Sequence, residues 1–183
     1  MKIAIITFLV LMSGVVALNL LGKSYIPEIT QESIVTGPSG ITNTVDMAEP
    51  APFFELLDVT GDKVKSSDFL GSPVVFTFWT TWNPASADQI KIFDDYVRRG
   101  DENLVKIVTI SSQEDKSIVV NFINRGEYMV KVLLDESGAI TEAYQARNLP
   151  ATYFLDKKGM VREIFIGILS ERQLVEKIEA LFQ

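Results

Sequence analysis

The sequence predicts an α/β fold, a layered domain in which helices flank a central sheet. Three observations lead to this prediction. Short apolar runs rich in β-branched and aromatic residues alternate with segments that carry apolar residues on one helical face. Turn residues such as glycine separate these segments. The chain of 183 residues is 47% hydrophobic, which is enough for one core. The alternation of strands and helices further predicts a largely parallel sheet.

The first segment of the chain is apolar enough to cross a membrane. Residues 3–22 carry no formal charge, and a helix of this length is about 30 Å long, which matches a bilayer core. No small-x-small cleavage site follows, so we expect a transmembrane anchor in residues 1–23, with a signal peptide as the alternative. Lys2 before the segment and Lys23 after it give a weak positive-inside bias. This predicts a single-pass cell-membrane protein with an extracytoplasmic domain.

A polar segment separates the predicted anchor from the folded domain. Residues 24–49 lose hydrophobic periodicity and gain Ser, Thr, Gly and Pro, so we expect a flexible tether. The domain is expected to span residues 50–183 and to open with a hairpin turned at Thr60-Gly61-Asp62. Asp58 beside this turn does not belong to a calcium-loop spacing and is interpreted as a turn residue.

The rest of the domain alternates between strands and helices. Continuous apolar runs predict strands at 73–80, 104–111 and 130–135. Apolar residues at helical spacing predict one helix after each of the first two strands, the second ending at Gly126, and a short helix at 139–146. The end of the chain predicts a hairpin at 151–167 and an amphipathic helix from Ser170.

The segment FWTTWNPASADQ, residues 78–89, holds the candidate site. In it a buried strand ends and an Asn-Pro pair opens the next helix. Asparagine is among the best N-cap residues and proline suits the first helical position, so Asn83-Pro84 is a good helix start worth about 1 kcal/mol. We interpret Trp79 as a core residue, whereas Trp82 suits burial and exposure equally.

Composition excludes several kinds of chemistry. The chain has no cysteine, which rules out disulfides and thiolate catalysis, and no histidine, the commonest general base. We therefore expect no metal and no cofactor, and interpret Asp94 and Asp95 as a solvated helix face. The net charge is −7, and removing the two lysines of residues 1–23 leaves −9. Nucleic acid is therefore not an expected partner.

From Ala51 to its end the chain resembles the thioredoxin superfamily, and within it the membrane-anchored TlpA/ResA-like thiol-disulfide oxidoreductases, which carry a redoxin (AhpC/TSA-like) domain. The resemblance covers about three quarters of the chain. The stretch APFFELLDVTGDKVKSSDFLGSPVVFTFWTTW is similar to the family's opening, and LPATYFLDKKGMVREIFIG to its closing hairpin. The resemblance implies a thioredoxin-like fold with a central mixed sheet flanked by helices.

In that family the strand ends in Trp-Cys-x-x-Cys, and a cis proline faces the two cysteines. The matching residues here are Trp82, Asn83, Ser86 and Pro150, so the resemblance implies the scaffold of the site without its sulfur. Asn83 cannot ionise, and Ser86 has no base to activate it. Gln89 stands where some members carry a proton-transferring carboxylate. A peroxiredoxin is excluded by the same missing cysteine.

Three functions remain open at this point. The first is an extracytoplasmic binding or assembly module without redox-active cysteines, whose partner is a protein or peptide. In the related enzymes a substrate peptide pairs with the backbone before the cis proline, which implies an apolar groove with unpaired backbone groups at Trp82, Ala85, Leu149 and Pro150. The second is an oxidoreductase of cytochrome c maturation or antioxidant type that relies on a partner's cysteines. The third is a purely structural scaffold.

Overall fold

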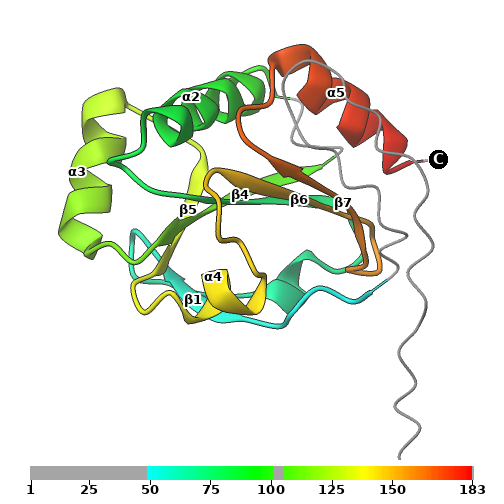
Figure 1. The fold of residues 1–183 in the computed structure, drawn as a ribbon, viewed down its shortest axis with the longest axis horizontal. Helices are drawn as coiled ribbons and strands as arrows, with labels where there is room; N and C mark the ends of the chain where they lie inside the picture. The colour runs from blue at the N-terminus through cyan, green and yellow to red at the C-terminus, as the bar shows by residue number, and fades with distance from the viewer. Residues whose placement is uncertain (1–48, 101–104, 183) are drawn as a thin grey trace, which may run out of the picture. The chain divides into compact units, whose positions relative to one another are not determined.

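The computed structural model describes residues 49–100 and 105–182 (Figure 1). In this part the strands are β1 (Glu55–Asp58), β2 (Lys63–Lys65), β3 (Val74–Trp79), β4 (Lys106–Ser112), β5 (Lys131–Asp135), β6 (Ala151–Leu155) and β7 (Val161–Ile166). The helices are the 3₁₀ helix η1 (Ser66–Phe69), α2 (Pro84–Arg98), α3 (Lys116–Gly126), α4 (Ala139–Ala143) and α5 (Glu171–Ala180).

All the strands form one mixed sheet in the order β2-β1-β5-β4-β3-β6-β7. Only the central pairs β3/β4 and β4/β5 are parallel, and the other neighbours are antiparallel. The prediction of a largely parallel sheet is therefore wrong, whereas the mixed sheet implied by the resemblance is confirmed. In the described part of the chain, α2 connects the parallel strands β3 and β4, and α3 connects β4 and β5. The hairpins β1–β2 and β6–β7 form the two edges of the sheet.

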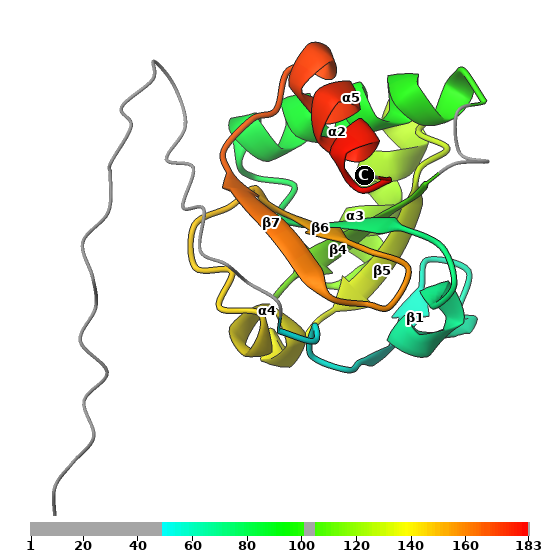
Figure 2. The same ribbon diagram turned by 90° about the vertical axis from the view of Figure 1, so that its right-hand side faces the viewer.

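Helices cover both faces of the sheet (Figures 1 and 2). Helices α2, α3 and α5 enclose one core with alternate residues of β3, including Val75 and Trp79. Helices α4 and η1 lie on the opposite side and enclose the second core with Phe76 and Phe78. Because β3 is buried on both faces, its sequence is a continuous apolar run. Trp79 is fully buried, as predicted.

The predicted elements occur at the predicted places, with shifts at their ends. The short helix stops at Ala143 rather than at 146, where Gln145 adopts a left-handed φ of 54°. Helix η1 was not predicted. The predicted anchor at 3–22 and all but the last residue of the tether at 24–49 lie outside the described residues. Within the described part of the chain, no helix is long and apolar enough to span a membrane.

The β1–β2 turn is held by one carboxylate, as its sequence predicts. Asp58 Oδ1 accepts hydrogen bonds from the backbone N–H groups of Thr60, Gly61 and Asp62. Its second oxygen accepts from Lys131 Nζ at 3.1 Å. Burial opposes ionisation of Asp58, but the hydrogen bonds from Thr60 and Lys131 hold its pKa well below the usual range. Asp58 is therefore a turn-forming residue.

Asp94 is not on a solvated helix face, and the prediction for it is wrong. Its side chain is buried, whereas Asp95 is exposed. Asp94 Oδ1 accepts from the backbone N–H groups of Met129 and Val130, and Oδ2 accepts from Arg98 at 2.5 Å. The carboxylate therefore ties α2 to the segment that leads into β5.

We expect Asp94→Asn to lower the free energy of unfolding by about 2–4 kcal/mol, because the amide cannot accept both backbone bonds and pair with Arg98. Urea unfolding followed by tryptophan fluorescence measures the change. Asp95→Asn on the same helix is the matched control and should change stability by less than about 0.5 kcal/mol. Equal effects of the two substitutions would contradict the role assigned to Asp94.

Candidate functional site

Helix α2 begins one loop after β3, and Asn83 is its N-cap. The cap residue is extended, and Asn83 Oδ1 accepts from Ala85 N at 3.0 Å. Pro84 occupies the first helical position, and the Asn83 carbonyl accepts from Ala87 N at 3.1 Å. The predicted helix start is therefore confirmed in its details. These bonds satisfy N–H groups that would otherwise be free at a helix terminus.

The loop before β6 faces this helix start. The Leu149–Pro150 peptide bond is cis, as predicted. Asn83 Nδ2 donates to the Leu149 carbonyl at 2.9 Å, so the loop and Asn83 are in direct contact. The Pro150 carbonyl accepts from Gly167 N at 2.9 Å. The Leu149 N–H has no hydrogen-bond partner in the described part of the chain. At Leu149 the carbonyl is therefore bonded, whereas the N–H has no partner among the described residues.

A buried carboxylate fixes the turn between β3 and α2. Glu114 accepts from Thr81 N at 2.8 Å, from Thr81 Oγ1 at 2.5 Å and from Ser111 Oγ at 3.2 Å. The next residue, Trp82, has 74% of its surface exposed. The sequence analysis missed Glu114, because no local pattern links it to a turn 33 residues earlier. The hydrogen bonds to Glu114 thus fix the backbone of the turn, and the turn presents the Trp82 side chain to solvent.

A groove of about 510 Å³ opens beside this turn, between the start of α2, the cis-proline loop, α4 and the loop after β4. Its lining residues are Thr80, Trp82, Asn83, Ser112, Gln113, Ser137, Gly138, Thr141, Glu142, Ala146, Arg147 and Leu149. Of the four residues predicted to form a binding groove, Trp82 and Leu149 line it. Pro150 is buried and Ala85 is half-buried, and neither lines it. The groove is more polar than the predicted apolar platform.

Four buried polar atoms near the helix start have no hydrogen-bond partner among the described residues. They are Trp79 Nε1, Thr80 Oγ1, Ser86 Oγ and Gln89 Nε2. Gln89 Oε1 accepts from Leu169 N at 2.6 Å, which orients its amide. Ser86 is fully buried and makes no hydrogen bond to the cis-proline loop, so the expectation that Pro150 faces it has no contact to support it. Buried polar groups are normally paired, so their gathering within residues 79–89 sets this region apart.

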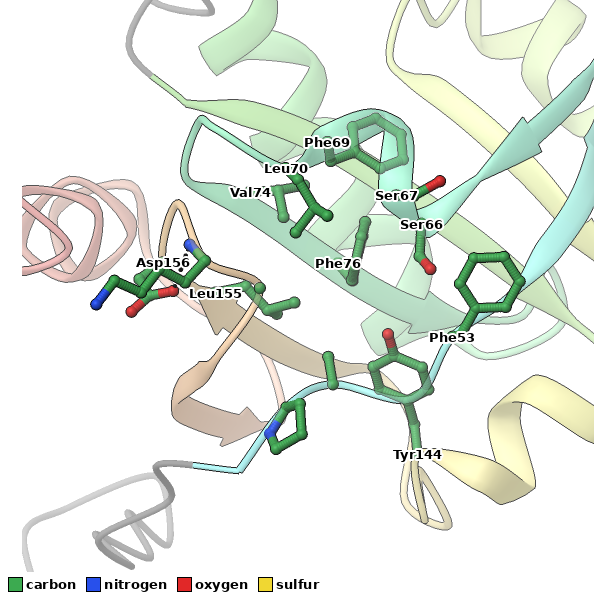
Figure 3. A pocket seen from close by; sticks show the side chains of 14 residues that line it. Phe53, Ser66, Ser67, Phe69, Leu70, Val74, Phe76, Tyr144, Leu155 and Asp156 are labelled. Carbon is green, nitrogen blue, oxygen red and sulfur yellow. Dashed lines mark hydrogen bonds between the residues drawn. The ribbon is translucent and has the colours of Figure 1, made fainter.

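A second pocket of about 200 Å³ lies on the α4 side of the sheet (Figure 3). Phe69, Leu70, Phe76 and Tyr144 are among its lining residues. Its buried phenol is already bonded, since Tyr144 Oη donates to the Pro52 carbonyl at 2.9 Å. Burial raises the pKa of Tyr144 well above its usual value, so this hydroxyl stays neutral. The rest of the lining combines the exposed Phe53 and Leu70 with polar residues that include Ser67 and Lys158.

The groups at the start of α2 are unsuited to nucleophilic or redox chemistry. Asn83 is a neutral amide with both polar atoms engaged. Ser86 is buried without a hydrogen-bond partner among the described residues, and so without a base. Gln89 does not ionise. In contrast, the Leu149 N–H has no hydrogen-bond partner among the described residues, and the Trp82 ring is exposed. The side chains of Asn83, Ser86 and Gln89 therefore supply no nucleophile.

Comparison with known proteins identifies relatives of this domain. A family model described as the AhpC/TSA family matches residues 47–164. The chain is 26% identical over 137 residues to the thiol-disulfide oxidoreductase ResA of Bacillus thuringiensis subsp. konkukian, covering 75% of this chain and 79% of that protein. It is 23% identical over 137 residues to the thioredoxin-like protein YneN of Bacillus subtilis, covering 74% and 80%.

Solved structures show the same fold. A putative thiol:disulfide interchange protein DsbE from Chlorobium tepidum superposes with a TM-score of 0.69 at 22% identity, covering 76% of this chain and 99% of that one. StoA from Bacillus subtilis superposes with a TM-score of 0.63 at 23% identity, covering 71% and 98%. The thioredoxin-like fold implied by the sequence is therefore confirmed.

The unpaired hydroxyl of Ser86 leads to a stability prediction. Ser86→Ala should raise the free energy of unfolding by about 1 kcal/mol, because it removes a buried unpaired group and improves helix propensity. Ser111→Ala is the matched control and should lower it by a similar amount, since Glu114 loses a donor. Urea unfolding of both variants makes the comparison. Destabilisation by Ser86→Ala would mean that its hydroxyl has a partner.

Proposed function

Because the chain belongs to the AhpC/TSA family, we propose that it is a thioredoxin-like binding module that has lost thiol-disulfide chemistry and kept a partner groove. The partner we propose is an extracytoplasmic protein or peptide, held without turnover. ResA is a thiol-disulfide oxidoreductase by name, and this chain has no cysteine with which to share that reaction.

The observation that carries the proposal is the double engagement of Asn83. Asn83 stands in place of the family's first cysteine. Its Oδ1 caps α2, and its Nδ2 donates a hydrogen bond to the Leu149 carbonyl. A thiolate at this position would draw on the free N–H groups of the helix terminus. Here the Asn83 oxygen takes one of those N–H groups, so the helix terminus serves folding and not catalysis.

The groove supports binding through its combination of groups. Trp82 projects from a turn that Glu114 holds, and a rigid exposed aromatic is a favoured anchor for a partner. The neighbouring Leu149 adds apolar surface and a free N–H. Arg147 and Glu142 add opposite charges at the rim. Such a mixture suits a protein segment better than nucleic acid, which requires clustered positive charge.

We further propose that residues 3–22 anchor the module in the cell membrane, with the domain on the extracytoplasmic side. The length and uncharged composition of this segment support the proposal. Membrane fractionation of cells that express the full chain, with protease added from outside, tests it. Recovery of a shortened soluble form would contradict the anchor.

The wild-type protein should not reduce insulin disulfides, because no group in it forms a thiolate. Replacing Asn83 and Ser86 with cysteine together should generate measurable reductase activity, since the new thiols would stand at the start of α2. Asn83→Ser combined with Ser86→Ala is the sulfur-free control and should stay inactive. Thiol-dependent turnover by the wild-type chain would overturn the proposal.

Trp82→Ala should weaken capture of the partner by about 2 kcal/mol, or on the order of 30-fold, because a central aromatic anchor is lost. The measurement is co-purification from solubilised membranes, quantified by mass spectrometry against the wild type. Phe53→Ala is the control, since Phe53 is a similarly exposed aromatic, 65% accessible, that lines the other pocket. Unchanged recovery with Trp82→Ala and also with Leu149→Asp would leave a purely structural scaffold as the function.

A further inference from the structure

We propose that the end of the domain at which the described chain begins docks on the surface of a bilayer that contains anionic lipids. The docking face consists of Phe53, Leu70, Lys157 and Lys158. Its apolar side chains enter the boundary between headgroups and acyl chains, and its lysines contact lipid phosphates. This inference goes beyond the partner groove, and it rests on the proposed anchor at residues 3–22, which keeps the domain near the bilayer.

The apolar half of the docking face lies at the second pocket. Phe53 is 65% exposed and Leu70 is 59% exposed, and both line this pocket. They come from separate segments, before β1 and after η1, and Figure 3 shows them on different sides of the pocket. Large apolar side chains that are exposed close together indicate a contact with another molecule or with a membrane.

The basic half of the docking face lies on the turn between β6 and β7. Lys157 and Lys158 are exposed, and neither forms an ion pair with a described residue. The adjacent carboxylate of Asp156 is already paired with Arg162 at 2.6 Å. The two lysines therefore add uncompensated positive charge beside the exposed apolar side chains.

Backbone hydrogen bonds hold the two halves together. Gly71 N donates to the Lys157 carbonyl at 2.8 Å, which joins the segment after η1 to the β6–β7 turn. Ala51 N, two residues before Phe53, donates to the Gly159 carbonyl at 3.0 Å. The start of the described chain is therefore fixed to the same turn that carries the lysines.

Charge and position favour an anionic bilayer as the occupant of this face. The chain after residue 23 has a net charge of −9, so an anionic surface repels the domain as a whole and attracts it only at a local basic site. Each lysine near such a surface strengthens attachment about fivefold. Under the proposed anchor, residues 24–49 keep the domain within about 90 Å of the bilayer, so a weak contact is enough for docking.

Docking at this end leaves the partner groove accessible. Val74 begins β3 and lines the pocket of the docking face, whereas Trp79 ends β3. The groove starts just beyond, where Thr80 and Trp82 line it. The six residues of β3 span about 17 Å between the two sites. One end of the domain therefore contacts the bilayer while the groove at the other end remains open to a partner.

The test uses the full-length chain in proteoliposomes, where its lack of cysteine allows one introduced thiol to carry an environment-sensitive dye. Ser67→Cys places the dye on the exposed part of η1, and Asn148→Cys places it on the exposed loop beside the groove. One set of vesicles is phosphatidylcholine, and the other also contains phosphatidylglycerol. With phosphatidylglycerol present, lipids that carry a nitroxide on the acyl chain should quench the dye at Ser67→Cys and not at Asn148→Cys.

Two pairs of substitutions separate a local contact from net charge. Lys157→Gln with Lys158→Gln should lower the docked-to-free ratio, measured at Ser67→Cys, by about 30-fold, because both basic contacts are lost. Lys91→Gln with Lys116→Gln changes the net charge equally on the exposed surfaces of α2 and α3. This control pair should leave the ratio unchanged within about twofold.

A third comparison tests the apolar half. Leu70→Gln should lower the same ratio by about tenfold, because its side chain no longer gains from leaving water. Ile118→Gln on α3 is the matched control, since Ile118 is 48% exposed and lies outside the docking face, and it should have no effect. Urea unfolding checks that all the variants remain folded.

Vesicle flotation separates this inference from the proposed anchor. Flotation with both kinds of vesicle, without quenching at Ser67→Cys, would overturn docking and leave the anchor standing. Flotation only with phosphatidylglycerol, together with this quenching, would support docking and overturn the anchor. An absence of flotation would overturn both.

Two further results would overturn the docking face. The first is an equal effect of the two lysine pairs, which would mean that net charge alone sets the contact. The second is a change of dye emission in detergent that grows with protein concentration and needs no lipid, which would mean that a second copy of the chain covers this face. Loss of quenching with the Lys157/Lys158 pair and with Leu70→Gln, but with neither control, would support the inference.

Discussion

The hydrogen bond from Asn83 to the Leu149 carbonyl is the contact on which the site depends. It joins the start of α2 to the cis-proline loop, two segments 66 residues apart in the chain. The same side chain caps α2 through its oxygen. One neutral residue thus fixes the helix start, orients the loop and occupies a backbone acceptor. Asn83, at the position of the family's first cysteine, thus supplies both the helix cap and the bond to the loop.

Two buried carboxylates extend this constraint to the neighbouring loops. Glu114 accepts the Thr81 N–H and hydroxyl and so fixes the turn that carries Trp82. Asp94 accepts two backbone N–H groups ahead of β5 and pairs with Arg98. A carboxylate is suited to this work because it offers several acceptor sites and is expensive to bury without donors. Glu114 thus holds the turn beside the groove, whereas Asp94 ties α2 to the segment that leads into β5.

The sequence predicts the local features of this structure and misses the distant ones. The cap at Asn83-Pro84 and the buried Trp79 follow from patterns within a few residues, and the cis bond before Pro150 follows from the resemblance to the family. The burial of Asp94 cannot be predicted from a local pattern, because its backbone partners lie 35 and 36 residues away. The role of Glu114 is missed for the same reason, since its partner Thr81 lies 33 residues away. The prediction of a largely parallel sheet was wrong because alternation of elements implies parallel strands only where a helix crosses over.

The groove differs from the predicted platform because the cis-proline loop turns inward. Pro150 is buried and its carbonyl bonds Gly167 N, so proline shapes the wall without forming its surface. The surface of the groove is formed instead by Trp82, Leu149 and the polar residues of α4 and of the loop after β4. The Leu149 carbonyl accepts from Asn83, whereas the Leu149 N–H has no hydrogen-bond partner among the described residues. The side chain that stands at the family's first cysteine position therefore joins the groove wall to the start of α2.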